Sequence, residues 1–95
     1  MGVVSLQGRI TVSNANEMRR TLADALRSQP GELTVDLLSV TYMDTSGLAT
    51  LIEAMRNARK QSTRLVLRSV QTQPRYLLTV TDLDHVFEIQ EAANT

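Results

Sequence analysis

Three consecutive residues carry side chains that can do chemistry. Asp44, Thr45 and Ser46 stand together in "TYMDTSGLAT" (41–50), just where an apolar run begins. All three residue types are good helix N-caps, because their side-chain oxygens accept hydrogen bonds from N–H groups that have no partner within a helix. One cap needs only one side chain. We therefore expect at least one of the two hydroxyl groups to be left over and exposed.

A spare hydroxyl at a helix N-terminus suits reversible phosphorylation. A phosphate adds about 1.5–2 negative charges at neutral pH. The N-terminal N–H groups and the positive end of the helix dipole stabilise that charge, so the fold tolerates it. A partner docked on the same surface would instead meet a new hydrated anion beside Asp44, and a loss of about 2.7 kcal/mol weakens a complex about a hundredfold. The stretch thus predicts a switch of association, with helix capping alone as the plainer alternative.

Other kinds of chemistry have little support in the sequence. His85 is the single histidine and there is no cysteine, so we expect no metal site, and we place His85 at the start of a strand. Ser46 does not stand in the G-x-S-x-G pattern of hydrolases, and no glycine-rich phosphate loop precedes Lys60. Asp82 and Asp84 are expected in a solvated turn. The sequence therefore predicts no enzyme, no metal and no cofactor.

Length and composition predict one small folded domain over residues 1–95. The 95 residues are 42% apolar and 21% charged, which is ordinary for a soluble protein that buries its own core. Ten basic residues balance ten acidic ones, so no attraction to nucleic acid or to an anionic membrane is expected. No apolar stretch approaches the roughly 20 residues that a membrane span needs. We expect a cytoplasmic protein without membrane insertion.

Hydrophobic spacing predicts strands that alternate with helices. Strand patterns cover two short runs around a turn at Gly8 within 3–12, then 32–38, 64–70 and 85–90. Helical patterns cover 13–31, with Ser13 or Asn14 as cap, 48–60, which starts within 44–47, and 72–83, with Pro74 in its opening turn; 91–95 reads as a frayed tail. Such alternation implies a largely parallel sheet. Residues 44–47 then lie at the carboxyl end of a strand, where ligand and partner sites gather.

The order of these features resembles the STAS domain, especially the bacterial anti-sigma factor antagonists. "VDLLSVTYMDTSGLATLIEAMRNAR" (35–59) is similar to the family's strand, then hydrophobic-x-Asp-Ser/Thr-Ser/Thr-Gly-Leu, then helix. "GRITVSNANEMRRTL" (8–22) is similar to its second strand and first helix, and "LTVTDLDHVFEI" (78–89) to its L-x-x-T-G-L-D-x-x-F-x-I ending. The resemblance implies a single α/β domain with a mixed, mostly parallel sheet of four to five strands and three to four helices.

The resemblance also implies a non-enzymatic binding module that regulates transcription by partner switching. When unphosphorylated, such a domain captures an anti-sigma factor that is also a serine/threonine kinase, and so frees the sigma factor. Once phosphorylated it lets go, and a phosphatase reverses the modification. The family's acceptor directly follows the motif's aspartate, which places it at Thr45. Ser46 is the second candidate, or caps the helix instead.

The implied partner surface includes the motif and the turn before the first helix. Asp44 would shape the site, and Gly47 and Leu48 would let a partner approach the start of the helix. The whole implied set is Thr11, Ser13, Asp44, Thr45, Ser46, Gly47 and Leu48. Several positions depart from the family pattern: Arg9 and Thr11 stand in "GRIT" where relatives often carry an acidic pair, and Asp82 replaces a glycine.

An alternative reading is an accessory subunit of a bacterial lipid-transport ABC system. Small STAS proteins with D-T-x-G-L sit on the cytoplasmic ATPase of such transporters, and Thr45 fits that group as an interface residue. The ATPase would then contact the same surface, from Asp44 to Leu48. The "LDHVFEI" ending (83–89) favours the antagonist group.

Overall fold

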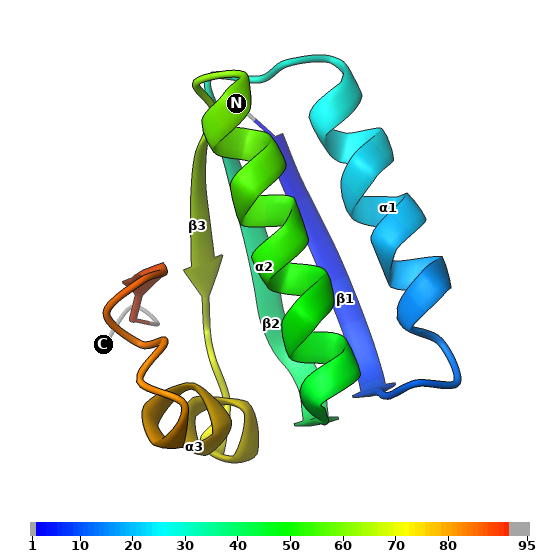
Figure 1. Cartoon of the computed structure of the whole chain (residues 1–95), viewed down its shortest axis with the longest axis vertical. Coiled ribbons are helices and arrows are strands. Elements are labelled where there is room, and N and C mark those ends of the chain that lie inside the picture. Colours follow the sequence, from blue (N-terminus) through cyan, green and yellow to red (C-terminus); the bar gives the residue numbers. More distant parts are fainter. Residues whose placement is uncertain (1, 92–95) are drawn as a thin grey trace.

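The computed structural model describes residues 2–91, in which strands and helices alternate (Figure 1). The elements are β1 (Gly2–Ile10), α1 (Ala15–Arg27), β2 (Glu32–Met43), α2 (Thr45–Lys60), β3 (Arg64–Arg68), α3 (Thr72–Val80) and β4 (Glu88–Gln90). The strands form one sheet in the order β1-β2-β3-β4. Four strands and three helices agree with the prediction, and every strand pairing within residues 2–91 is parallel. No helix in this part is long and apolar enough to cross a membrane.

The core lies between the sheet and two helices. α1 and α2 lie side by side over one face of the sheet, and α3 lies beyond the end of β3 (Figure 1). Because side chains alternate along a strand, one face of β2 and β3 is apolar. The buried residues that meet there are Leu33, Val35, Leu37, Leu65 and Leu67 from the strands, and Leu22, Leu26, Leu51, Ala54 and Ala58 from the helices. This two-layer packing fixes the ends of β1 and β2 relative to the start of α2.

Gly8 does not form the predicted turn between two strands. β1 continues through it to Ile10, with φ of +83° at Gly8. The register between β1 and β2 shifts between Ser5 and Gln7 and again between Gly8 and Arg9, and β2 carries an extra residue at each shift. Gly8 therefore adopts the left-handed backbone that glycine permits within an irregular, bulged strand pairing and not in a turn. As a result, β1 reaches the carboxyl edge of the sheet.

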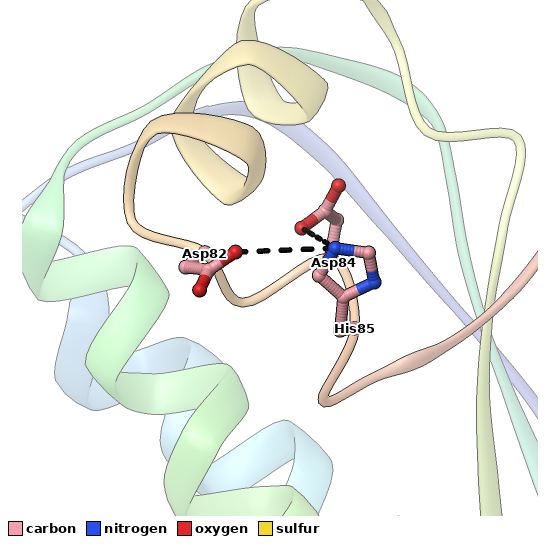
Figure 2. A group of neighbouring side chains, drawn as sticks. All are labelled: Asp82, Asp84 and His85. Carbon is pink, nitrogen blue, oxygen red and sulfur yellow. Dashed lines mark ion pairs between the residues drawn. The ribbon is translucent and has the colours of Figure 1, made fainter.

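The chain between α3 and β4 is a turn, and the predicted last strand is shorter than expected. His85 lies in this turn rather than at a strand start, because β4 begins only at Glu88. Figure 2 shows the His85 ring next to two carboxylates, with Nε2 at 3.9 Å from Asp82 Oδ1 and 3.7 Å from Asp84 Oδ1. Asp82 has φ of +62°, a conformation that aspartate tolerates better than most residues. This accounts for an aspartate where the family pattern has glycine.

The predicted tail lies mostly outside the described residues. Glu91 is described, and its carboxylate pairs with the Arg75 guanidinium of α3 at 2.9 Å. The rest of the predicted tail, 92–95, is not among the residues that the structure describes.

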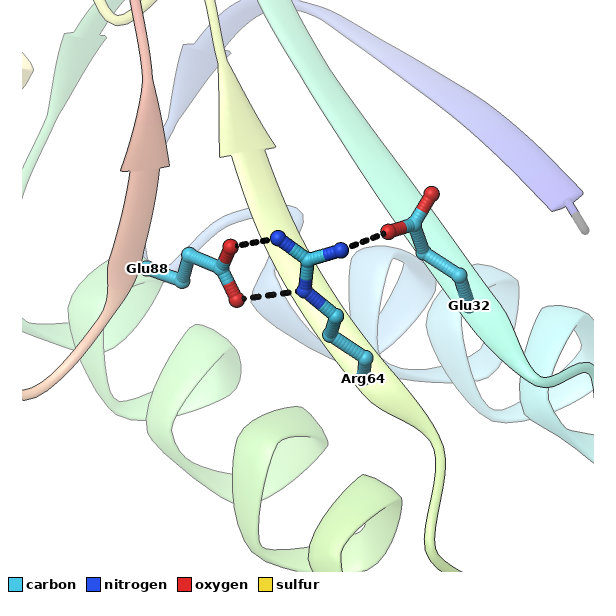
Figure 3. A network of polar contacts seen from close by, with 3 residues as sticks. All are labelled: Glu32, Arg64 and Glu88. Atoms are coloured by element: carbon cyan, nitrogen blue, oxygen red, sulfur yellow. Dashed lines mark hydrogen bonds and ion pairs between the residues drawn. The ribbon is translucent and has the colours of Figure 1, made fainter.

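The other face of the sheet carries charged side chains that pair across strands. Arg64 of β3 stands between Glu32 of β2 and Glu88 of β4 (Figure 3). Its Nη1 lies 2.8 Å from Glu32 Oε2, and its Nε donates to Glu88 Oε1 at 2.8 Å. The bond to Arg64 lowers the pKa of Glu88. Since Arg64 and Glu88 are exposed and Glu32 is only half-buried, the cluster links β4 to β3 but adds little stability.

Asp36 joins a second cross-strand pair to the bulge in β2. Its Oδ1 accepts a hydrogen bond from the backbone N–H of Leu38 at 3.0 Å, and its Oδ2 accepts one from Arg68 Nη2 at 2.9 Å. The bond from Arg68, followed by that from Leu38, lowers the pKa of Asp36. A lowered folded-state pKa stabilises the fold at pH values above the unfolded pKa of about 3.9, and this contribution is lost as the pH falls through the folded pKa.

We therefore expect Asp36→Asn to lower the free energy of unfolding by about 1 kcal/mol at pH 7. The difference from wild type should shrink as the pH is lowered below about 4. Urea unfolding across this range measures it. Asp24→Asn removes a carboxylate from a far more exposed pair with Arg27, and should change stability little at any pH. A constant deficit for Asp36→Asn at every pH would contradict this account.

Candidate functional site

The polar stretch lies at the junction between β2 and α2, where a single residue connects the two. β2 ends at Met43 and α2 begins at Thr45, with Asp44 as N-cap in an extended conformation. Asp44 Oδ1 accepts hydrogen bonds from the backbone N–H groups of Ser46 at 2.8 Å and Gly47 at 3.1 Å. Asp44 is thus the cap. The alternative that Ser46 caps the helix is wrong, because Ser46 already lies within it.

Asp44 also holds the turn between β1 and α1. Its Oδ2 accepts a hydrogen bond from the backbone N–H of Val12 at 3.2 Å, and its own N–H donates to the Ile10 carbonyl at 3.1 Å. One carboxylate therefore serves two segments: one oxygen caps α2 and the other positions the turn. This turn contains Thr11, which is half-buried, and Ser13, which is exposed.

Asn14 supports the same turn and does not cap α1 with its side chain. It occupies the N-cap position, but its Oδ1 accepts from the N–H of Thr11 at 2.9 Å and its Nδ2 donates to the Arg9 carbonyl at 2.8 Å. Asn14, one of the two predicted caps, is thus the N-cap residue, but its side chain does not bond the N–H groups of α1. The Arg9 guanidinium lies over the Tyr42 ring, 4.3 Å from its centroid. Arg9, which stands where the family often has an acidic residue, thus packs against the sheet.

The two candidate hydroxyls differ in accessibility. Thr45, the first residue of α2, is exposed, whereas Ser46 is half-buried. One turn further along, Thr50 is buried and its hydroxyl donates to the Ser46 carbonyl at 3.0 Å. Thr45 is therefore the hydroxyl residue of α2's first turn that a visiting protein reaches most easily.

Gly47 and Leu48 lie inside the protein. A Cβ atom on Gly47 would stand 2.7 Å from Met43 Cγ and 2.8 Å from Ile10 Cγ2, so the glycine lets α2 begin directly against β1 and β2. The Leu48 side chain is buried in the core. Both residues are thus covered in this structure, and a partner contact at these two positions stays a prediction.

Gln73 was not identified from the sequence, yet it joins α3 to the same junction. Its Oε1 accepts from the Met43 N–H at 2.8 Å, and its Nε2 donates to the Met43 carbonyl at 3.0 Å. The side-chain amide thus pairs with the end of β2 as a neighbouring strand would. A glutamine before a proline in a helical first turn gives no sequence signal for this role.

The sequence was compared with models of known protein families. A family model described as "Mlab, STAS domain" matches residues 1–91. The chain belongs to the STAS domain family. STAS domains are typically binding modules without catalytic activity.

Two curated relatives of different kinds contain a stretch similar to this STAS domain. The anti-sigma-B factor antagonist of Bacillus subtilis (strain 168) is 29% identical over 86 residues, which span 90% of this chain and 78% of the relative. The putative sulfate transporter YvdB of the same organism is 26% identical over 85 residues, which span 90% of this chain but 16% of that protein.

Solved structures share the fold of this STAS domain. A putative anti-sigma factor antagonist from Thermotoga maritima superposes with a TM-score of 0.83 at 19% identity, over 96% of this chain and 80% of that one. The Bacillus cell fate determinant SpoIIAA in its phosphorylated form gives 0.73 at 17% identity, over 97% and 82% of the two chains. The fold of this STAS domain is therefore that of the anti-sigma factor antagonists.

The junction between β2 and α2 places Thr45 on the surface of this STAS domain. Asp44 is committed to backbone N–H groups, and His85 and Asp82 are exposed in a different turn. What the junction offers is an exposed hydroxyl on a rigid helix start, flanked by the turn that Asp44 holds and by the α3 helix that Gln73 holds. This arrangement can recognise a protein, and its charge can be changed at one atom.

Proposed function

We propose that this STAS domain is a phosphorylation-controlled binding module of the anti-sigma factor antagonist type. In the unphosphorylated form it sequesters an anti-sigma factor that is also a serine/threonine kinase, and so frees a sigma factor. Phosphorylation at Thr45 releases that partner, and a phosphatase resets the module. The observation that carries the proposal is the exposed Thr45 at the first position of a helix whose cap is another residue.

The geometry supports a switch that leaves the fold intact. The Thr45 side chain does not cap the helix, because Asp44 accepts the hydrogen bonds from the N–H groups of Ser46 and Gly47. A phosphate at Thr45 would sit at the positive end of the helix dipole, which stabilises an anion. The same anion would have to lose its hydration if a partner covered it, at a cost that disfavours the complex. The likeness to the anti-sigma-B factor antagonist supports this choice of partner class.

A second candidate is an accessory subunit of a bacterial lipid-transport ABC system, which would contact the transporter's ATPase through the exposed part of the same surface. The similarity to a stretch of a putative sulfate transporter favours keeping this candidate, because it puts the same kind of domain in a transport protein. In that case Thr45 would be an interface residue without modification.

Intact-mass measurement tests the proposal. The purified protein is incubated with ATP and each anti-sigma factor/kinase encoded in its genome. We expect a gain of one phosphate that vanishes in Thr45→Val and persists in Ser46→Ala. Modification that survives in Thr45→Val would refute the assigned acceptor. If no kinase modifies the wild type, and it co-purifies stably with an ABC ATPase, the second candidate is correct.

A further inference from the structure

Two exposed apolar side chains stand on either side of the Thr45 site. Val12, in the turn between β1 and α1, is 76% exposed, and Tyr76, on α3, is 65% exposed. Figure 1 shows that this turn, the start of α2 and α3 lie along the same end of the molecule, with the start of α2 between the other two. Val80, which is also exposed, follows Tyr76 by one helical turn and extends the apolar area on α3.

Hydrogen bonds to residues 43 and 44 fix the two backbone segments that carry these side chains relative to Thr45. On one side, the Asp44 carboxylate holds the backbone of Val12 at 3.2 Å. On the other side, Gln73 pairs with both backbone groups of Met43, and Tyr76 lies one turn further along the same helix. The three segments therefore form one unit. Backbone segments that are held in place before binding lose less conformational entropy in a complex.

The shape of this unit indicates the kind of partner. Val12 and Tyr76 project into solvent, so a partner must supply the hollows that receive them. A folded protein surface provides such hollows at two separated points, whereas a small ligand needs a concave site on this chain. Tyrosine is among the residues that most often contribute a large share of the binding energy at protein interfaces.

We propose that Val12 and Tyr76 are the two apolar anchors that seat in separate pockets of the kinase partner, with Thr45 enclosed between them. This inference rests on the proposed function and adds the contacts that produce affinity. It also explains why one phosphate is sufficient for release: both anchors can seat only when the surface between them is dehydrated. A charge at Thr45 prevents that, even though it touches neither anchor.

Biolayer interferometry tests the anchors. The probe is the purified kinase that phosphorylates the wild type, used without ATP. We expect about tenfold weaker binding for Val12→Ser and about thirtyfold for Tyr76→Ser. Val3→Ser on β1 and Leu38→Ser on β2 are matched controls, since these apolar residues are 57% and 61% exposed but lie outside the three segments. Both controls should bind within about twofold of wild type.

The possible results test the two anchors and the proposed function separately. If both anchor variants bind within about twofold of wild type while Thr45→Glu abolishes binding, the anchors are refuted and the proposed function stands. If the control variants lose as much affinity as the anchor variants, the anchors are refuted as well. If Thr45→Glu binds as tightly as wild type, the proposed function fails together with the inference. Thermal unfolding of each variant confirms that the comparison is made on folded protein.

Discussion

Gly47→Ala should lower the free energy of unfolding by about 2 kcal/mol. The added methyl group would meet Met43 Cγ at 2.7 Å, Ile10 Cγ2 at 2.8 Å and the Ile10 carbonyl oxygen at 3.0 Å. Overpacking of this kind costs up to about 3 kcal/mol, because neighbouring groups, here including a backbone oxygen, must move. The better helix propensity of alanine returns about 1 kcal/mol. The steric cost should therefore exceed the gain.

Urea unfolding of two glycine variants measures this effect. Gly31→Ala is the matched control, because nothing lies within 4 Å of a Cβ atom placed there. Its stability should stay within about 0.5 kcal/mol of wild type. If Gly47→Ala proves as stable as wild type or more so, α2 does not need to begin in direct contact with the ends of β1 and β2.

Thr45→Glu should weaken binding to the kinase partner about hundredfold, equivalent to about 2.7 kcal/mol. The carboxylate places a permanent negative charge beside Asp44 and imitates part of the charge of a phosphate. Stability should be unchanged or slightly raised, since an acidic residue in the first turn of a helix interacts favourably with the dipole. The substitution therefore separates association from folding.

The measurement compares kinase binding and urea unfolding of the same variants. Ala23→Glu adds the same charge on an exposed position of α1, outside the proposed interface, and should bind like wild type. Thr45→Val should retain binding but lose phosphorylation. A Thr45→Glu variant that fails to bind because it is unfolded would contradict the idea that this helix start tolerates an anion.

The arrangement of strands and helices is predictable from the sequence because it follows from burial. The alternation of Leu33, Val35 and Leu37 requires a strand with one apolar face, and these residues are indeed buried. The predicted strand, 32–38, ended too early, and β2 continues to Met43, directly before Asp44. Gly8 shows where local reasoning fails, since a glycine with positive φ suits a turn and a bulge equally well, and only the pairing with β2 decides between them.

The internal organisation of the site depends on contacts between distant parts of the chain. The bond from Val12 to Asp44 spans 32 residues, and that from Met43 to Gln73 spans 30. No periodicity or motif encodes such pairs. The close surroundings of Gly47 have the same origin, because one of the residues that limits the space there is Ile10 of β1, far from it in sequence. The sequence pattern therefore indicated which residues surround the start of α2, but not which of them are exposed and which are covered.

The one-residue connection between β2 and α2 fixes the side of the molecule on which Thr45 lies. Each residue of a helix turns the chain by about 100°, so inserting or deleting a single residue after Met43 would swing position 45 to another side of the molecule. Substitutions at exposed positions of the turn that carries Val12, or of α3, leave this spacing unchanged. Divergence toward new partners in this lineage should therefore accumulate in those two neighbouring segments, while the spacing from Met43 to Thr45 stays fixed.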